Sequence, residues 1–510
     1  MLIIHKVASW YLSRRMERLQ SEIAYPLAYQ EEVFQHLQRK AKDTAFGKKH
    51  GFTEDLTIGS FQQQVPVSTY EDLYPYIERI IKGETNVLWP GKIEWFSKSS
   101  GTTNDKSKYI PMSDETLDAT HFKAGRDMLA VYFELNPESK LLSGKSLSIA
   151  GSHDIVPGGS ARAGDLSAVL VENLPAFFEL VRTPKKKVAL MSEWESKIDL
   201  MAEQSMVEDV TGFAGVPTWT LILINTIFEK LGKEDRNLFD VWPNLEVFFH
   251  GGVNFEPYRA QFEALLPGNQ MHYMNIYNAS EGYFGFQDDF GKDDMVLLPN
   301  HGIFYEFVPL EEVGEPFPSS HTLEEVELGK TYSMVISTNA GLWRYAIGDT
   351  VEFTSKNPFR FRIVGRTKHF INAFGEELMV GNAEQAMVRA CGATGAIIDN
   401  YTAAPVYFSE NSQGAHEWLI EFKNQPDDFS HFCQVLDSTL KEINSDYAAK
   451  RYNDMALRFP TIHNMPVGTF YDWMKQRGKL GGQNKVPRLS NDRKYVDSIL
   501  EMVGAGFRKD

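Results

Sequence analysis

Cysteine is scarce in this chain, which has only Cys391 and Cys433 among 510 residues. Two distant cysteines cannot build a disulfide framework, so the expected compartment is the reducing cytoplasm. Neither a paired C-x-x-C nor an H-E-x-x-H pattern is present, which leaves no structural or protease-type zinc site to propose. No apolar run reaches the length of about eighteen residues that spans a bilayer. Charges interrupt the first apolar stretch, so no cleaved signal peptide is expected either.

Positive charge is also in short supply. Lysine and arginine number 52 against 68 acidic residues, a net charge of −16. This is the wrong sign for a protein whose main partner is nucleic acid. A single nucleotide is still allowed, because it needs only a local loop rich in hydrogen-bond donors.

The chain has the composition of a folded protein, with 43% hydrophobic and 13% aromatic residues. Short apolar runs alternate with helical patterns, which predicts an α/β fold of mixed α+β type. We expect a large N-terminal domain, residues 1–365, of mixed β-sheets flanked by helices with a β-barrel-like part. A small C-terminal α+β domain, residues 366–510, should follow. Elements that this reading places include a buried helix over Thr218–Phe228, a long helix over Phe429–Tyr447 and a strand over Met455–Phe459.

The first chemical motif is WFSKSSGTTNDKSKYIP, residues 95–111. Its loop combines four hydroxyls with a glycine that lets backbone N–H groups turn inward, as a phosphate cradle requires. Lys108 would add a point charge. The loop lacks the G-x-x-x-x-G-K-[ST] pattern, which disfavours a P-loop nucleotidase, and an ordinary Ser/Thr-rich hairpin turn is the alternative. The cradle residues are Ser99, Ser100, Gly101, Thr102 and Thr103.

The second motif is MNIYNASEGYFGF, residues 274–286, where a buried strand runs into Tyr277, Ser280 and Glu281. A carboxylate at a strand end can hold Mg²⁺ beside phosphates, and a tyrosine there can line a base. The alternative is a surface carboxylate that caps a turn.

Glycines mark three further places. In LWRYAIGDTVEF, residues 342–353, Gly348 and Asp349 lie between two apparent strands, where the aspartate could accept both hydroxyls of a ribose or simply form a hairpin turn. In IVGRTKHFINAFGEELM, residues 363–379, Arg366 lies where two domains would articulate, which is a natural place for a hinge, and a plain exposed linker is the alternative. Gly251 and Gly252 follow a strand and either approach a ligand with their backbone or form a structural turn.

Taken together and in this order, the motifs resemble the acyl acid amido synthetases, the plant auxin-responsive family with bacterial relatives, within the adenylate-forming superfamily. SSGTT with Lys108 and Pro111 is similar to the family's SSGTS motif, YNASE to YASSE, and LWRYAIGD to LYRYRVGD. GRTKHFINAFGEEL is similar to the superfamily's hinge motif. GGQNKVPRL resembles the family's NQYKTPR segment and supplies Lys485. The second motif departs from the pattern, since Asn278 and Ala279 replace Ala and Ser.

The resemblance implies an enzyme that uses ATP and Mg²⁺ to join a small carboxylic acid to the amine of an amino acid. Glu281 would hold the metal, Asp349 the ribose, and Lys485 or Lys108 the α-phosphate region. A thioester synthetase for coenzyme A or a carrier protein is one alternative, and a non-catalytic nucleotide-binding protein is another. The residues that the resemblance and the motifs place around the nucleotide are Ser99, Ser100, Gly101, Thr102, Thr103, Gly251, Gly252, Tyr277, Asn278, Ser280, Asp349 and Arg366.

Overall fold

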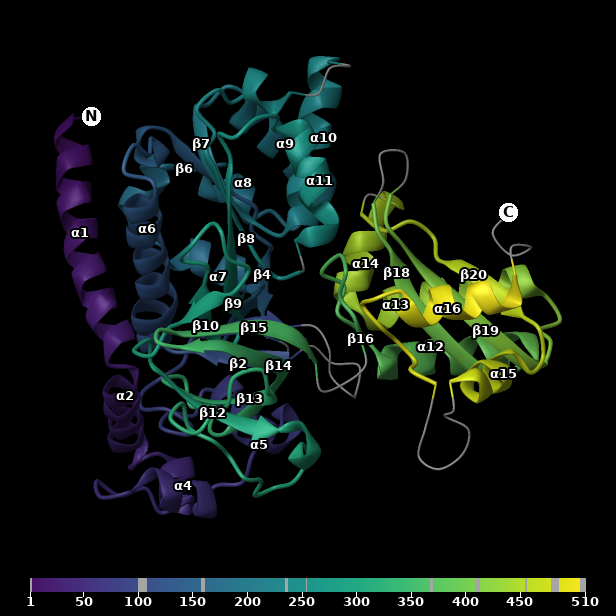
Figure 1. The fold of residues 1–510 in the computed structure, drawn as a ribbon, viewed down its shortest axis with the longest axis horizontal. Helices are drawn as coiled ribbons and strands as arrows, with labels where there is room; N and C mark the ends of the chain where they lie inside the picture. The colour runs from purple at the N-terminus through teal and green to yellow at the C-terminus, as the bar shows by residue number, and fades with distance from the viewer. Residues whose placement is uncertain are drawn as a thin grey trace. The chain divides into compact units, whose positions relative to one another are not determined.

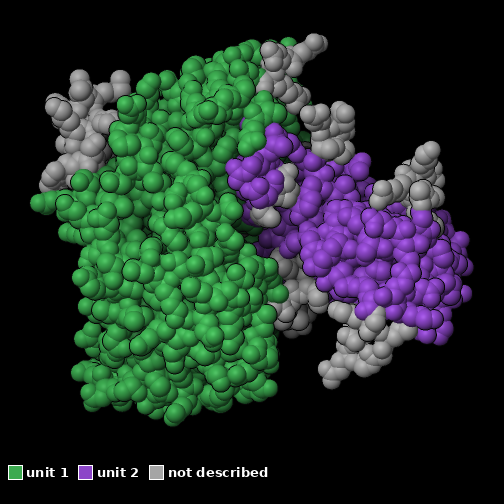
Figure 2. Space-filling model, in the orientation of Figure 1, with its two compact units in different colours: residues 1–99, 108–252, 263–367 green, residues 100–107, 253–262, 368–510 purple. Residues whose placement is uncertain are grey.

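The computed structural model contains two compact units (Figure 2). Unit 1 contains Met1–Ser99, Lys108–Gly252 and Glu263–Thr367, and unit 2 contains Val253–Phe262 and Lys368–Asp510. The structure describes residues 2–99, 108–156, 161–233, 237–253, 255–366, 370–408, 413–454, 456–477 and 486–504.

Unit 1 is built on an eleven-stranded mixed sheet (Figure 1). From β12 to β9 the neighbouring strands are antiparallel, and from β9 to β6 they are parallel. β9 therefore joins the two halves. Ligands of α/β sheets bind at the carboxyl ends of parallel strands, so the end of β9 is a natural site. In sheet order the strands are β12 (Ile303–Pro309), β13 (Thr331–Thr338), β14 (Tyr345–Lys356), β15 (Phe359–Arg366), β11 (Met295–Leu297), β10 (Gly282–Phe286), β9 (His272–Ala279), β8 (Val247–His250), β7 (Val210–Gly215), β3 (Lys145–Ser148) and β6 (Arg182–Thr183).

A second, four-stranded sheet of unit 1 carries the first motif. Its order is β2 (Lys108–Met112), β1 (Trp95–Ser99), β5 (Arg162–Gly164) and β4 (His153–Ile155). β1 and β2 pair antiparallel with Ser99 opposite Lys108. The two strands thus bring both ends of the motif together.

The helices of unit 1 include one π-helix, η1, which runs directly into α6. Long helices α1 and α6 lie side by side (Figure 1). The helices are α1 (Leu2–Ala24), α2 (Pro26–Ala41), α3 (Ala45–Lys49), α4 (Ile58–Gln64), α5 (Tyr70–Ile81), η1 (Thr116–Phe122), α6 (Lys123–Leu135), α7 (Leu166–Asn173), α8 (Lys186–Ala189), α9 (Trp194–Met206) and α10 (Pro217–Leu231), with short 3₁₀ turns at Leu141–Ser143, Ala176–Leu180, Leu238–Asp240 and Leu310–Glu312.

Aromatic side chains fill the core between α2–α5 and the antiparallel half of the sheet. The ring of Phe34 packs against Phe61 and Phe304, with centroids 5.3 and 5.0 Å apart. Trp343 is buried against Phe52 and donates its indole N–H to the Leu88 carbonyl at 3.2 Å. Large rings at these positions bury much apolar area per residue, which stabilises the half of the sheet that carries the third motif.

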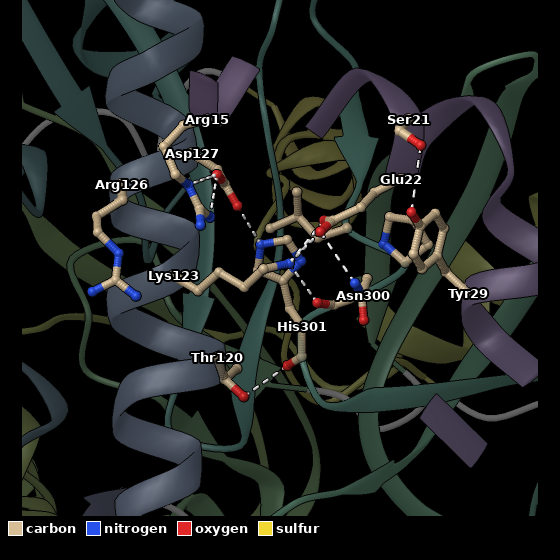
Figure 3. A network of polar contacts seen from close by, with 12 residues as sticks. Arg15, Ser21, Glu22, Tyr29, Thr120, Lys123, Arg126, Asp127, Asn300 and His301 are labelled. Carbon is tan, nitrogen blue, oxygen red and sulfur yellow. Dashed lines mark hydrogen bonds and ion pairs between the residues drawn. The ribbon is translucent and has the colours of Figure 1, made fainter. Parts of the chain in front are cut away.

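A buried network of charges attaches α1 to α6 (Figure 3). Lys123 donates to both carboxylate oxygens of Glu22, at 2.9 and 2.8 Å. Asp127 accepts from Arg15 at 2.8 Å and pairs with the Nε2 atom of His301 at 2.9 Å. Glu22, Asp127 and His301 lie close enough to share a cation. The ammonium of Lys123 already supplies that positive charge, so we assign the cluster to helix anchoring.

Unit 2 has its own three-stranded sheet and its own core, made by residues such as Leu419, Trp473 and Ile499. Tyr258, from α11 (Glu256–Leu265), donates its hydroxyl proton to the Ala373 carbonyl within this unit. The elements are β16 (Phe370–Ile371), β17 (Leu378–Met379), α12 (Val380–Thr394), β18 (Ile397–Val406), β19 (Ala415–Asn424), α13 (Phe429–Ile443), α14 (Ser445–Arg451), a 3₁₀ turn (Tyr452–Asp454), β20 (Thr461–Met465), α15 (Thr469–Gln476) and α16 (Lys494–Val503).

The mixed α/β fold class is confirmed, and so is the buried helix over Thr218–Phe228, which lies inside α10. Three local predictions are wrong. The long helix over Phe429–Tyr447 is broken at Asn444, whose side chain accepts the N–H of Tyr447 at 2.8 Å and caps a new helix. The strand expected over Met455–Phe459 lies at Thr461–Met465 instead.

The third error concerns Gly348 and Asp349, which were expected between two strands, and the alternative of a hairpin turn is wrong as well. Both lie inside the single strand β14. Gly348 has φ +91°, near the point where the register between β13 and β14 shifts. A bulge of this kind re-aims a neighbouring side chain without ending the strand, so Asp349 is presented from a sheet and not from a loop.

Among the described residues, no helix is both long and apolar enough to cross a membrane.

Candidate functional site

The end of β9 carries the second motif on the strand that joins the two halves of the sheet. Ser280 and Glu281 form the tight turn between β9 and β10. Successive residues of a strand point to opposite faces. Tyr277 and Asn278 therefore project from opposite faces of the sheet, both near the carboxyl end of β9.

On one face, Tyr277 contacts the aspartate of the third motif. The Tyr277 hydroxyl donates to Asp349 Oδ2, and Arg366 Nε donates to Asp349 Oδ1 at 2.5 Å. Asp349 and Arg366 are opposite each other in the β14–β15 pairing, so the sheet register itself creates the ion pair. Burial raises the pKa of Tyr277 well above its ordinary value, and the negative charge of Asp349 raises it further. The tyrosine is thus a fixed neutral donor.

The first motif reaches the same place from the second sheet. Ser97 Oγ donates to Ser280 Oγ at 2.8 Å, which ties β1 to the turn after β9. Lys108 Nζ lies 3.4 Å from the Tyr345 hydroxyl at the start of β14. Ser99 ends β1 and is half-buried. The rest of the expected phosphate loop, Ser100, Gly101, Thr102 and Thr103, lies outside the described residues.

Glu281 lies close enough to two buried tyrosines to act on them electrostatically. After burial itself, its negative charge is the largest cause of the raised pKa of Tyr345, and it adds a smaller increment at Tyr277. A partly exposed carboxylate at a strand end, between tyrosines of the second and third motifs, is a hard oxygen ligand of the type that Mg²⁺ accepts. The donor chemistry fits the metal that the sequence implies.

Two glycines shape the neighbouring strand end. At Gly251, directly after β8, an added Cβ would lie 2.5 Å from the carbonyl oxygen of Ile276 on β9. Gly252 has φ +82°, a conformation that favours glycine. Both positions therefore need glycine for structural reasons, and their contact with a nucleotide stays a prediction.

Three of the sequence motifs meet through side-chain contacts in unit 1, and the fourth contributes Arg366. Lys485 lies outside the described residues. Directly after Lys485, the segment from Val486 is held on β18, where Thr402 Oγ1 donates to the Pro487 carbonyl at 2.6 Å.

Sequence reasoning missed two residues that contact these motifs. His121, on η1, bonds to Asn278 at 2.9 Å. Arg344 lies within the third motif and is buried in an ion pair with Glu306. Arg344 had a visible signal in the sequence, because it is an arginine within an apolar stretch, whereas nothing near His121 in the sequence indicates its distant partner.

Comparison with known proteins agrees with this arrangement. Residues 15–271 match the model of the GH3 family N-terminal domain, residues 295–366 the central domain and residues 381–494 the C-terminal domain.

Two curated relatives are plant enzymes. The jasmonoyl–L-amino acid synthetase JAR4 of Nicotiana attenuata is 27% identical over 63% of this chain and 66% of its own length. The indole-3-acetic acid-amido synthetase GH3.3 of Arabidopsis thaliana is 23% identical over 90% of this chain and 88% of its own.

The solved structure of the GH3.15 acyl acid amido synthetase in complex with 2,4-DB superimposes with a TM-score of 0.62 at 18% identity, over 95% of both chains. The fold is therefore that of an acyl acid amido synthetase. The family model for the N-terminal domain alone covers half of the sequence, and the chain belongs to the GH3 family.

Proposed function

We propose that this protein is a ligase that activates a carboxylic acid with ATP and transfers the acyl group to the amine of an amino acid, forming an amide. The observation that carries the proposal is the meeting of Tyr277, Asp349 and Arg366 at the edge of the sheet, with Ser97 and Ser280 beside them. Such a junction of motifs supports a nucleotide site in a member of the GH3 family.

In the first half-reaction, the substrate carboxylate attacks the α-phosphorus of ATP, which gives an acyl-adenylate and pyrophosphate. The protein must bring anions together and neutralise the charge that grows between them. We assign the ribose hydroxyls to Asp349, the phosphates to the hydroxyls of the first motif, and the α-phosphate region to Lys485 or Lys108. Mg²⁺ would screen phosphate charge, and Glu281 is the residue that would hold it.

In the second half-reaction, the amine attacks the acyl carbon and AMP leaves. A mixed anhydride is already activated, so the protein needs to bind and orient the deprotonated amine more than to supply a strong base. We further propose that the small C-terminal domain, residues 366–510, moves between the two half-reactions about a hinge near Arg366. The two described cysteines are free, which is consistent with work in the cytoplasm.

The acid itself stays open. The two relatives are named for different acids, a jasmonoyl and an indole-3-acetyl group, on the same family scaffold. Specificity of this kind depends on pocket shape outside the shared motifs.

The test is pyrophosphate release from ATP and Mg²⁺ across a panel of carboxylic acids, each with pooled amino acids and separately with coenzyme A. We expect acid-dependent release that amino acids accelerate, with mass spectrometry showing the amide. Faster turnover with coenzyme A would favour a thioester synthetase, and ATP binding without release for any acid would favour a non-catalytic binder.

Glu281→Ala should lower the rate by about 10²-fold or more, as removal of a charge-stabilising group does. A matched control is Glu352→Ala, which removes a partly exposed carboxylate from β14 only three residues after Asp349. Equal loss in both variants would contradict the role of Glu281.

A further inference from the structure

The π-helix η1 places a histidine against the second motif. A π-helix is wider than an α-helix, is rare, and occurs often at functional sites. Its seven residues, Thr116–Phe122, lie between β2 and α6. The wider turn changes which residues face the sheet, and one of those that do is His121.

Three hydroxyls hold η1 in place. Ser113 donates to the Asn339 carbonyl at 2.7 Å, and its oxygen accepts the N–H of Thr116 at 2.9 Å. Thr116 also donates to the Asn339 side chain at 2.9 Å, and Thr120 donates to the His301 carbonyl at 2.7 Å. All of these hydroxyl groups are buried. The position of His121 is therefore imposed by the frame around it.

His121 bonds to Asn278 within the second motif. The two side-chain atoms, His121 Nδ1 and Asn278 Oδ1, are 2.9 Å apart. With an amide oxygen as acceptor, Nδ1 carries the proton. Burial lowers the pKa of His121 to about 4, so the ring is neutral at physiological pH and its one N–H proton, on Nδ1, is engaged with Asn278. Among the described residues, no group bonds to its buried Nε2 atom. What the ring does is hold Asn278.

Asn278 is one of the positions at which this chain departs from the family pattern, which has alanine there. An alanine makes no side-chain hydrogen bond, so a chain that follows the family pattern at this position cannot make the contact that Asn278 makes with His121. Because strand residues alternate, Asn278 is held on one face of β9 while Tyr277 is held by Asp349 on the other. The end of β9 is thus held by a hydrogen bond on each face of the sheet.

We propose that His121 is a positioning residue of the nucleotide site, which acts through Asn278 to hold the end of β9 and hence Tyr277, Ser280 and Glu281. The inference rests on the proposed function, since it assumes that ATP binds at this strand end.

The experiment is a double-mutant cycle on ATP affinity, measured by calorimetry with Mg²⁺ and followed by pyrophosphate release where an acid substrate is known. We expect His121→Leu and Asn278→Ala each to weaken ATP binding about tenfold, the usual effect of losing one buried hydrogen bond. Because both remove the same bond, the double variant should be no more than about twofold weaker than either single one. His121→Asn, which keeps a donor near the Nδ1 position, should recover most of the affinity.

The control is His272→Leu, the same substitution at the opposite end of β9, where the ring stacks on Phe290. It should leave ATP affinity unchanged. If His121→Leu fails to fold, Asn278→Ala removes the same hydrogen bond by changing its acceptor, and the ATP affinity of that variant tests the proposal.

The inference is overturned if the two losses add, if His121→Asn binds as weakly as His121→Leu, or if wild type and both single variants bind ATP equally. A wild-type protein that does not bind ATP at all would instead overturn the proposed function.

Discussion

At the residue scale, Tyr277 has two groups that can act at the site. Its ring can line a base, and its hydroxyl donates to Asp349. The hydroxyl holds one carboxylate oxygen while Arg366 holds the other. A carboxylate held at both oxygens is oriented before any ligand arrives, which lowers the cost of ordering it on binding. The remaining lone pairs of Asp349 are then the acceptors available to a ribose.

Tyr277→Phe separates these uses, because it keeps the ring and removes the hydroxyl. We expect the KM for ATP to rise about tenfold or more, because a hydrogen bond to a charged group contributes about 1.5–3 kcal/mol, with a smaller change in kcat. Steady-state kinetics would show the split. Tyr283→Phe is the control, since that buried hydroxyl on β10 contacts only the sulfur of Met128, at 3.4 Å, among the bonds that the structure describes. A wild-type KM in Tyr277→Phe would show that the hydroxyl does not orient Asp349.

At the scale of an element, β14 depends on the buried guanidinium at its start. Arg344 has φ +42°, and its Nη1 atom donates to the carbonyls of Gln62 and Val65 at 2.8 and 2.7 Å. Its Nη2 atom lies 3.0 Å from Glu306 on β12, and both side chains are fully buried. One residue thus joins the helix α4 region to two strands and sets where β14, with Tyr345 and Asp349, begins.

Arg344→Met should lower the free energy of unfolding by about 3–5 kcal/mol, because it leaves the Glu306 carboxylate buried without its partner. The double variant Arg344→Met/Glu306→Gln should be less destabilised than Arg344→Met, since the uncompensated charge is gone. Urea denaturation followed by circular dichroism measures both. Arg79→Met, which breaks an exposed pair with Glu84, should cost less than about 1 kcal/mol. Equal losses in the buried and exposed variants would refute the argument.

At the scale of the whole molecule, hydrophobic side chains divide between separate cores. Two cores of unit 1 contain residues between Leu19 and Phe361, and a core of unit 2 contains residues between Ala404 and Leu500. A unit with its own core can fold as a unit. Unit 2 also includes one segment from outside residues 368–510. Tyr258 of α11, which lies between β8 and β9 in sequence, packs on Tyr407 and Phe408 of unit 2.

Residues 368–510 expressed alone should therefore fold and unfold cooperatively, with lower stability than in the full chain because the Tyr258 contacts are missing. Thermal unfolding followed by near-ultraviolet circular dichroism would test this. Ile499→Asp, which puts a charge into the core, should abolish the transition in the same fragment. A fragment without a cooperative transition would mean that unit 2 needs the rest of the chain.

Local sequence determined the parts of this protein that depend on neighbours along the chain. The buried helix over Thr218–Phe228 and the motif residues could be read from spacing and residue type, because hydrophobic periodicity and short motifs act over a few residues. Only the tertiary structure decided which distant residues meet. His121 and Asn278 are 157 residues apart and Tyr277 and Asp349 are 72, and no local pattern encodes either contact. They arise because the sheet brings β9 beside η1 on one face and within reach of β14 on the other, and burial then makes each polar partner necessary.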